Sequence, residues 1–394
     1  MKLKISLIVG SFLLLLSGCI PVLDRGEEED IIIVEETEDS EEQHYVITPT
    51  IDTPENFYRN VLNEGRYNRS PARGNVADAM NNRIDINQFE LGLMEIATAH
   101  FPQSDYYFQE GQFLTGDTIN SWLRRYDSSE TRYMYGLNPP LGEGETDEER
   151  MRSNPLILSN VMEHNYWYGS EEEGVNLGGV VIGLALRSVY YFRTEDEEGR
   201  YHFHEEPLDL EMVEREGRAM AQEVVSRLRN DERIGDTPIT IALFQEQRRG
   251  SIVPGSFIAM AELGEGQTTI QNWEPINEQF VFFPSNQGRN TDPNLSNTFS
   301  QFRTDVEEFF GRTIGIVGKG RYKNDSLDEL TIEFNMQSHG KAEIIALTQF
   351  VSGRLNSMFD QIQAPIYVYF NSINGPESLI VRHPDREPYI HIYK

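Results

Sequence analysis

The sequence predicts an α+β fold made of two tandem copies of a similar helix–strand–helix–strand domain, which follow an N-terminal extension. Three observations carry this prediction. Alternating apolar residues recur in two parts of the chain, an amphipathic segment follows each, and a strand preceded by proline comes after each amphipathic segment. At about 100–200 residues per domain, a chain of 394 residues accommodates two domains.

The first strand of each copy has apolar residues at every second position. These are residues 180, 182, 184 and 186 in the first copy and residues 330, 332, 334 and 336 in the second. Because successive side chains of a strand point to opposite faces, this alternation predicts half-buried strands over residues 180–188 and 330–338. The two strands begin 150 residues apart.

A helix and a second strand follow in both copies. The positions on the predicted buried face of the helix are Val213, Gly217, Met220, Ala221, Val224 and Leu228 in the first copy and Ile344, Leu347, Thr348, Val351 and Leu355 in the second. Pro238 and Pro365 then precede alternating strands over residues 239–243 and 366–370. Helix and second strand share one offset of 127 residues, which indicates an internal repeat.

A further helix is expected to precede the first strand of each copy. It would begin at Leu158 in the first copy and at Leu295 in the second, each as part of a Leu-Ser-Asn sequence. Pro155 and Pro293 stand just before these residues, and proline suits the first turn of a helix.

Additional strands complete the two copies. A third strand is expected over residues 257–263 and over residues 378–381, and 23 extra residues in the first copy predict a hairpin over residues 190–204. The resulting division of the chain is a signal peptide at 1–18, an acidic tether at 19–54, a first repeat domain at 55–264 and a second repeat domain at 265–394.

The N-terminal segment has the features of a secretory signal peptide. Lys2 and Lys4 precede an uncharged apolar run over residues 5–16, and small residues precede Cys19. The sequence Leu16-Ser17-Gly18-Cys19 matches the lipobox of bacterial lipoproteins, in which the cysteine is acylated and becomes the first residue after cleavage. The alternative is an ordinary signal peptide with an incidental cysteine.

Acylation of Cys19 would anchor the chain at the membrane with its body on the extracellular face. Each buried CH₂ group adds about 0.8 kcal/mol, so a multiply acylated cysteine holds a protein stably. Residues 24–42 then hold eleven acidic residues and one basic residue, a composition typical of a disordered tether. Within the tether, Ile31-Ile32-Ile33-Val34 is either an edge strand that docks on the body or an isolated apolar spot.

Charge and cysteine content exclude several kinds of site. The formal net charge is −30, which argues against a nucleic-acid partner because phosphate binding needs clustered Lys and Arg. The single cysteine excludes intramolecular disulfides and cysteine-based zinc sites. The acidic balance of the body is attributed to solubility or to a salty medium rather than to an acid-lined binding site.

Few residues suggest a metal-binding or ligand-binding site. His202 and His204 alternate on the predicted hairpin and are weak candidates for a metal site, because two imidazoles on one face of a strand could share an ion. Outward placement without a chemical role is the favoured alternative. Residues 166–168 (Tyr-Trp-Tyr) and the turn-rich residues 136–147 could edge a groove for a peptide or glycan, although core packing explains them as well. No cofactor is expected.

The sequence resembles the CamS-type sex-pheromone lipoproteins of Gram-positive bacteria over nearly the whole body. The matching motifs, in order, are YFQEGQFL (107–114), GLNP (136–139), GETD (144–147), SVYY (188–191), PGSFI (254–258) and HIY (391–393). The family is described as two copies of one repeat domain, which agrees with the internal repeat. The resemblance carries over no catalytic residue.

The resemblance implies a function for the signal peptide. In such precursors the apolar heptapeptide before the lipidated cysteine is released and acts as a pheromone on recipient cells, where a receptor would be its partner. The corresponding residues are Phe12, Leu13, Leu14, Leu15, Leu16, Ser17 and Gly18. They depart from the aliphatic-rich form ending in Ala or Ser that is associated with active members.

Three hypotheses therefore remain open at this stage. The first is a non-enzymatic, membrane-anchored surface lipoprotein whose signal peptide is a pheromone precursor. The second is a binding module in which the two copies hold a peptide or a cell-wall fragment in a groove between them. The third is an extracellular hydrolase with paired carboxylates, which requires a pocket with convergent acids of raised pKa.

Overall fold

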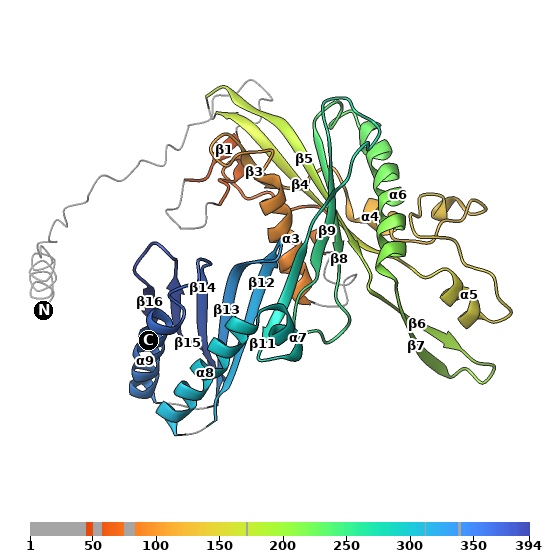
Figure 1. Cartoon of the computed structure of the whole chain (residues 1–394). Helices are drawn as coiled ribbons and strands as arrows, with labels where there is room; N and C mark the ends of the chain where they lie inside the picture. The colour runs from red at the N-terminus through yellow and green to blue at the C-terminus, as the bar shows by residue number, and fades with distance from the viewer. Residues whose placement is uncertain (1–44, 50–56, 75–82, 171, 312, 338–339) are drawn as a thin grey trace, which may run out of the picture. The chain divides into compact units, whose positions relative to one another are not determined.

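The computed structural model describes residues 45–49, 57–74, 83–170, 172–311, 313–337 and 340–394 (Figure 1). The predicted signal peptide, Cys19 and most of the predicted tether lie outside the described residues. At the end of that predicted tether, β1 (Tyr45–Ile47) pairs antiparallel with β2 (Val61–Asn63). No helix among the described residues is long and apolar enough to cross a membrane.

Six strands form the sheet of the first copy, in the order β10-β9-β8-β5-β4-β3. Their bounds are β3 Tyr107–Glu110, β4 Leu158–Ser170, β5 Gly174–Leu186, β8 Ile239–Gln245, β9 Ser256–Leu263 and β10 Glu274–Pro275. The pair β5 and β8 is parallel, and the other neighbouring pairs are antiparallel. Because β10 pairs with β9, the first sheet continues past residue 264, where the sequence analysis places the domain boundary.

Six further strands form the sheet of the second copy, in the order β11-β12-β13-β14-β15-β16. Their bounds are β11 Glu278–Phe283, β12 Gly315–Lys323, β13 Ser326–Met336, β14 Ile366–Ser372, β15 Gly375–Arg382 and β16 Tyr389–Ile392. Here β13 and β14 are parallel and the other neighbouring pairs are antiparallel. When the first sheet is read from β3 to β10 and the second from β11 to β16, the strands follow one another in chain order in both sheets. Both sheets have one parallel pair, in the centre, so their strand directions also agree.

The registers of the two parallel pairs confirm the internal repeat. In the first copy Val180 pairs with Ile239, and in the second copy Leu330 pairs with Ile366. These four residues are related by the same offsets of 150 and 127 residues that the sequence shows. The predicted α+β fold with two tandem copies is therefore confirmed.

Helices connect and cover the strands. In the first copy they are α3 Arg83–Ala97, α4 Gly116–Trp122, α5 Asp147–Ser153 and α6 Leu210–Arg229, with a 3₁₀ turn at Thr131–Tyr133; in the second they are α7 Asn286–Thr291, α8 Pro293–Phe310 and α9 Lys341–Met358. The helices α6 and α9 are the predicted amphipathic ones, and the buried residues of both include every predicted buried-face position. The helices α8 and α9 lie along one face of the second sheet (Figure 1).

The prediction of a half-buried first strand is wrong for β5, which is buried on both faces over residues 179–186. Val180 and Ile182 pack in the core cluster that includes α6, while Val181 and Ala185 pack in the cluster that includes α3. The residues between the alternating apolar positions are therefore also buried. The alternation was visible in the sequence, but the second covering helix was not.

Gly183 allows α3 to approach β5 closely. A Cβ atom at this position would lie 2.5 Å from a ring carbon of Phe89 and 2.7 Å from a methyl carbon of Leu93, both on α3. Both side chains are fully buried. Interiors are close-packed, so a side chain at residue 183 would have to push the helix away from the sheet.

The prediction of a helix beginning at Leu158 is wrong, because this residue begins the strand β4. Two backbone amides at this point, those of Ile157 and Leu158, donate to the side chain of Asn138, which sets the start of the strand. In the second copy, by contrast, the expected helix is present as α8, which begins at Pro293. The Asp292 carboxylate accepts from the Leu295 amide and caps it. The Leu-Ser-Asn match between the copies is coincidental.

Asp85 ties the start of α3 to the loop between β8 and β9. Its carboxylate is fully buried and accepts hydrogen bonds from the backbone amides of Gln247 and Gly255, both at 2.8 Å. Burial raises the pKa of Asp85 to about 6, although both hydrogen bonds act in the opposite direction. The folded protein therefore binds a proton at Asp85 more tightly than the unfolded chain does.

This pKa predicts a pH dependence of stability. The stabilisation that protonated Asp85 contributes is complete below about pH 4 and is lost as the pH rises through about 6. Asp85→Asn cannot titrate, so the free energy of unfolding of the wild type minus that of the variant should fall by about 3 kcal/mol between pH 4 and pH 7. Urea denaturation across this range measures the difference, and a difference independent of pH would contradict the assignment.

Candidate functional site

Two of the hollows formed by the described residues could hold a ligand, and both are lined by the first copy alone. The hairpin groove, of about 480 Å³, is lined by Tyr191, Phe192, Arg193, Phe203, His204, Glu205 and Arg249. The polar cavity, of about 260 Å³, is lined by Ser70, Ala72, Arg73, Ile86, Asn87, Glu90, Glu110, Leu114, Ile119, Val161, Met162, Glu163 and His164.

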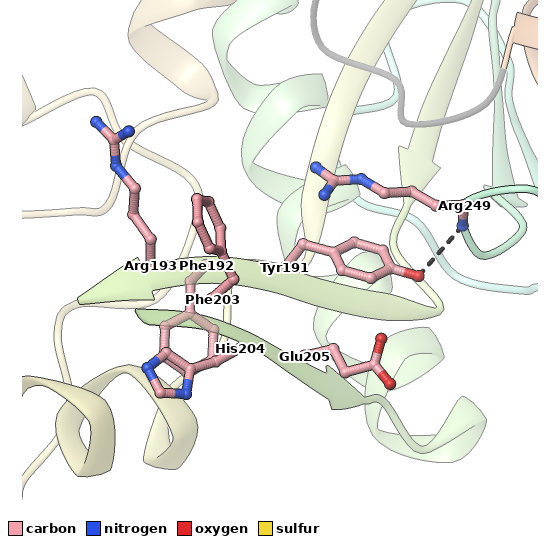
Figure 2. Close-up of a pocket in the computed structure, with 7 residues that line it drawn as sticks. All are labelled: Tyr191, Phe192, Arg193, Phe203, His204, Glu205 and Arg249. Atoms are coloured by element: carbon pink, nitrogen blue, oxygen red, sulfur yellow. Dashed lines mark hydrogen bonds between the residues drawn. The ribbon is translucent and has the colours of Figure 1, made fainter. Parts of the chain in front are cut away.

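The hairpin groove lies on the predicted hairpin, which is confirmed as β6 (Val189–Glu195) and β7 (Tyr201–Pro207). Figure 2 shows side chains of both hairpin strands, including Glu205, together with Arg249 from the loop between β8 and β9. The Arg249 guanidinium lies 4.3 Å from the ring centre of Tyr191, and Phe203 is 80% exposed. The exposed surface of the groove therefore combines aromatic and cationic side chains with one acidic side chain, that of Glu205.

The two histidines of the hairpin have separate partners. His202 Nε2 lies 2.9 Å from Asp196 Oδ2, and this hydrogen bond is the main cause that lowers the pKa of Asp196 to about 2. His204 Nε2 lies 2.8 Å from the Thr194 hydroxyl, and its ring stacks on Phe192. Among the described residues no group of three His, Cys, Asp or Glu side chains could hold a metal ion, so the structure offers this weak candidate no third ligand.

The aromatic run and the turn-rich segment of the sequence analysis contribute to packing. Tyr166 is fully buried and stacks on Phe101 at 5.1 Å between ring centres, so it is a core residue. Asn138 is also fully buried, and its side chain hydrogen-bonds to backbone groups of Leu123, Ile157 and Leu158. Neither residue lines the hairpin groove or the polar cavity.

The polar cavity is built where β3 ends. Glu110, the last residue of β3, is 6% exposed. Its carboxylate accepts from the Tyr67 hydroxyl at 2.6 Å, the Ser70 amide at 2.7 Å and the Arg73 guanidinium at 2.6 Å. Arg73 keeps about half of its side chain exposed, so the ion pair reaches from the cavity to solvent.

Glu163 of β4 holds the loop that follows β3. Its buried carboxylate accepts hydrogen bonds from the backbone amides of Gln112, Phe113 and Leu114 and from the side-chain amide of Asn165. Burial raises the pKa of Glu163, and these hydrogen bonds oppose the rise. These hydrogen bonds hold the loop after β3 against β4, so the Glu163 carboxylate has a structural role.

Gly111 makes this arrangement possible. A Cβ atom at residue 111 would lie 2.5 Å from Cβ and 2.6 Å from the carbonyl oxygen of Glu163. A side chain at residue 111 would therefore displace β4 or the loop.

Glu90 and His164 are two lining residues of the polar cavity with shifted pKa values. Burial, and after it the negative charge of Glu110, raises the pKa of Glu90. His164 is 2% exposed, its Nδ1 atom has no hydrogen-bond partner among the described residues, and burial lowers its pKa to about 3. Its imidazole is therefore neutral at physiological pH.

Local sequence patterns do not distinguish these cavity residues. The chain has 64 Asp and Glu residues, and nothing local distinguishes Glu90, Glu110 or Glu163 from the others. One available signal was the segment 107–114 that carries part of the family resemblance, because it contains Glu110, Gly111 and the loop bound by Glu163.

Comparison with known proteins gives consistent matches. Residues 67–388 match the family model described as the CamS sex pheromone cAM373 precursor. The C-terminal domain of the sex pheromone staph-cAM373 precursor from Staphylococcus aureus is 33% identical, with a TM-score of 0.69, over 81% of this chain and 99% of that chain. A sex pheromone precursor from Lactobacillus salivarius is 26% identical, with a TM-score of 0.78, over 89% and 99%. Comparison with curated proteins gives no significant match.

Proposed function

Because the chain belongs to the family of CamS sex pheromone cAM373 precursors, we propose that it is a surface lipoprotein whose signal peptide is the source of a secreted pheromone. In this proposal cleavage before Cys19 leaves an acylated N-terminus in the outer leaflet of the cell membrane. The body then stands on the extracellular face, at the end of the acidic tether, and has no catalytic role.

The placement of Cys19 is the observation that carries the proposal. The only cysteine of the chain directly follows an apolar run and the small residues Ser17 and Gly18. Residues 12–18 are uncharged, so the released heptapeptide would partition into membranes and suit an apolar pocket in a receptor on a recipient cell.

Replacing the cysteine tests the anchor. Cys19→Ala removes the thiol that accepts the lipid, so we expect no acylated N-terminal peptide in the membrane fraction and no cleavage before residue 19. Ser11→Ala, within the apolar run, is the control and should be processed like the wild type. Mass spectrometry of the N-terminal peptide measures both. Acylation or cleavage that persists in Cys19→Ala would exclude the lipoprotein proposal.

A second function is supported by the hairpin groove. Arg193 lies 4.4 Å over the ring of Tyr201, Arg249 lies over Tyr191, and Phe203 is exposed, so aromatic faces and positive charge are presented together. Aromatic faces suit sugars and peptides alike, and the arginines suit their carboxylates. We propose peptide or cell-wall-fragment binding as the alternative role of the body. A thermal-shift screen with such fragments tests it, and no stabilisation by any fragment would count against it.

A further inference from the structure

The polar cavity presents unsatisfied hydrogen-bond acceptors. No hydrogen bond of the Glu90 carboxylate to a described residue is present, and Nδ1 of the buried His164 has no partner among those residues. Glu110 pairs with His164 across β3 and β4, so the two side chains lie on the same face of the sheet. The donors of Arg73 and Tyr67 are directed to Glu110.

The charges of the polar cavity favour a cation. The lining residues include three acidic side chains, Glu90, Glu110 and Glu163, and one guanidinium, that of Arg73. His164 is neutral because its pKa is about 3. Like charges that share a low-dielectric site repel each other, which is reflected in the raised pKa of Glu90. A bound positive charge would relieve this repulsion and supply the missing hydrogen-bond donors.

The apolar lining residues and the volume of the polar cavity further restrict the kind of ligand that it could bind. Leu114, Ile119 and Val161 are buried apolar side chains that line the same cavity. A volume of about 260 Å³ lies just below the ~300–1,000 Å³ of typical small-molecule sites. The described residues hold no group of three metal-ligating side chains, so the donor set suits an organic cation better than a metal ion.

We propose that the polar cavity binds the primary ammonium group of a small aliphatic amine, with Glu90 as the main counter-charge and the neutral imidazole of His164 as a hydrogen-bond acceptor. The ammonium donates three hydrogen bonds, and its aliphatic part lies against the apolar wall. Both the amino terminus of an apolar peptide and a simple alkylamine have this chemistry. The inference concerns the body alone, so its failure would leave the precursor proposal untouched.

Three probes test the ligand class by calorimetric titration of the full chain purified in detergent. L-leucinamide and isopentylamine carry the ammonium, whereas N-acetyl-L-leucinamide has the same side chain without the charge. We expect saturable binding of both amines and none of the acetylated probe at about 1 mM. Tighter binding of L-leucinamide would indicate a peptide terminus as the source, and equal binding a simple amine. Equal binding of the acetylated probe, or no binding of either amine, would overturn the proposal.

Variants of Glu90 test the counter-charge. Glu90→Gln should weaken binding of the amines by about tenfold or more, whereas Glu90→Asp, which keeps the charge, should retain more of the affinity. Because Glu90 repels Glu110, Glu90→Gln should unfold at the same temperature as the wild type or a higher one. The exposed Glu130 is the matched control, and Glu130→Gln should change the affinity by less than about twofold. Equal losses in Glu90→Gln and Glu90→Asp, or unchanged affinity in Glu90→Gln, would contradict the assigned role.

Discussion

Replacing Asn138 by alanine is expected to lower the free energy of unfolding by about 4 kcal/mol. The Asn138 side chain makes four hydrogen bonds, all to the backbone. Nδ2 donates to the carbonyl oxygens of Leu123 at 2.8 Å and Leu158 at 3.0 Å, while Oδ1 accepts from the amides of Ile157 at 2.7 Å and Leu158 at 2.8 Å. The substitution leaves these backbone groups without partners at a fully buried site, which costs more than the bonds contribute.

Two further variants make the Asn138 prediction specific. Asn138→Asp keeps the shape but removes the two donors, so it should lose nearly as much stability as Asn138→Ala. Asn176, on the exposed part of β5, is the control, and Asn176→Ala should change the free energy of unfolding by about 0.5 kcal/mol or less. Urea denaturation measures all three. A loss in Asn138→Ala no larger than in the control would show that the GLNP motif does not fix the start of β4.

Replacing Glu163 by alanine is expected to cost about 3 kcal/mol and to free residues 112–114 from β4. The Glu163 carboxylate is the acceptor for the amides of Gln112, Phe113 and Leu114, the last at 2.7 Å. Without the carboxylate these donors remain in a buried loop. Hydrogen exchange of the three amides and thermal unfolding measure the effect.

Glu163→Gln separates charge from hydrogen bonding. The amide is neutral, so the desolvation cost of the carboxylate disappears, but one oxygen is replaced by a donor that faces other donors. We expect Glu163→Gln to lose less than half of what Glu163→Ala loses, and Glu232→Ala, at an exposed position, to lose about 0.5 kcal/mol or less. Exchange of the loop amides in Glu163→Ala at the wild-type rate would refute the role assigned to Glu163.

The repeat could be predicted from the sequence because it rests on local periodicity and a constant offset. Val180 with Ile239 and Leu330 with Ile366 occupy the same register, so two independent segments supported one interpretation. The hairpin was predictable for the same local reason. The strand β4 was not, because Leu158 resembles Leu295 in its neighbours while its hydrogen bonds to Asn138 come from a distant turn.

The polar cavity could not be predicted, because its properties arise from long-range packing. Glu90 is ordinary in the sequence and becomes distinctive only when α3 places it near Glu110. His164 lies between Glu163 and Asn165 on β4, and its sequence neighbours do not show that the folded structure leaves its Nδ1 without a partner among the described residues. In a chain with 64 Asp and Glu residues, the sequence does not distinguish a buried carboxylate from an exposed one.

The paired-carboxylate hydrolase hypothesis gains little from the polar cavity. The cavity does bring acids with raised pKa together, as that hypothesis requires. However, Glu163 is held by three backbone amides, and Glu110 is paired with Arg73. Of the three carboxylates that line the cavity, only Glu90 is not engaged by donors among the described residues. Acid–base catalysis by paired carboxylates needs two such groups, so ligand binding explains the arrangement better.

Mass spectrometry of culture supernatant for the heptapeptide of residues 12–18 tests the central claim most directly. The strains are the parent, a strain with the gene deleted and a strain with Cys19→Ala. The precursor proposal predicts the peptide in the parent alone, together with acylated Cys19 in its membrane fraction. Absence of the peptide from a parent strain that carries acylated Cys19 would contradict the claim and would leave the function of this chain in its two-copy body.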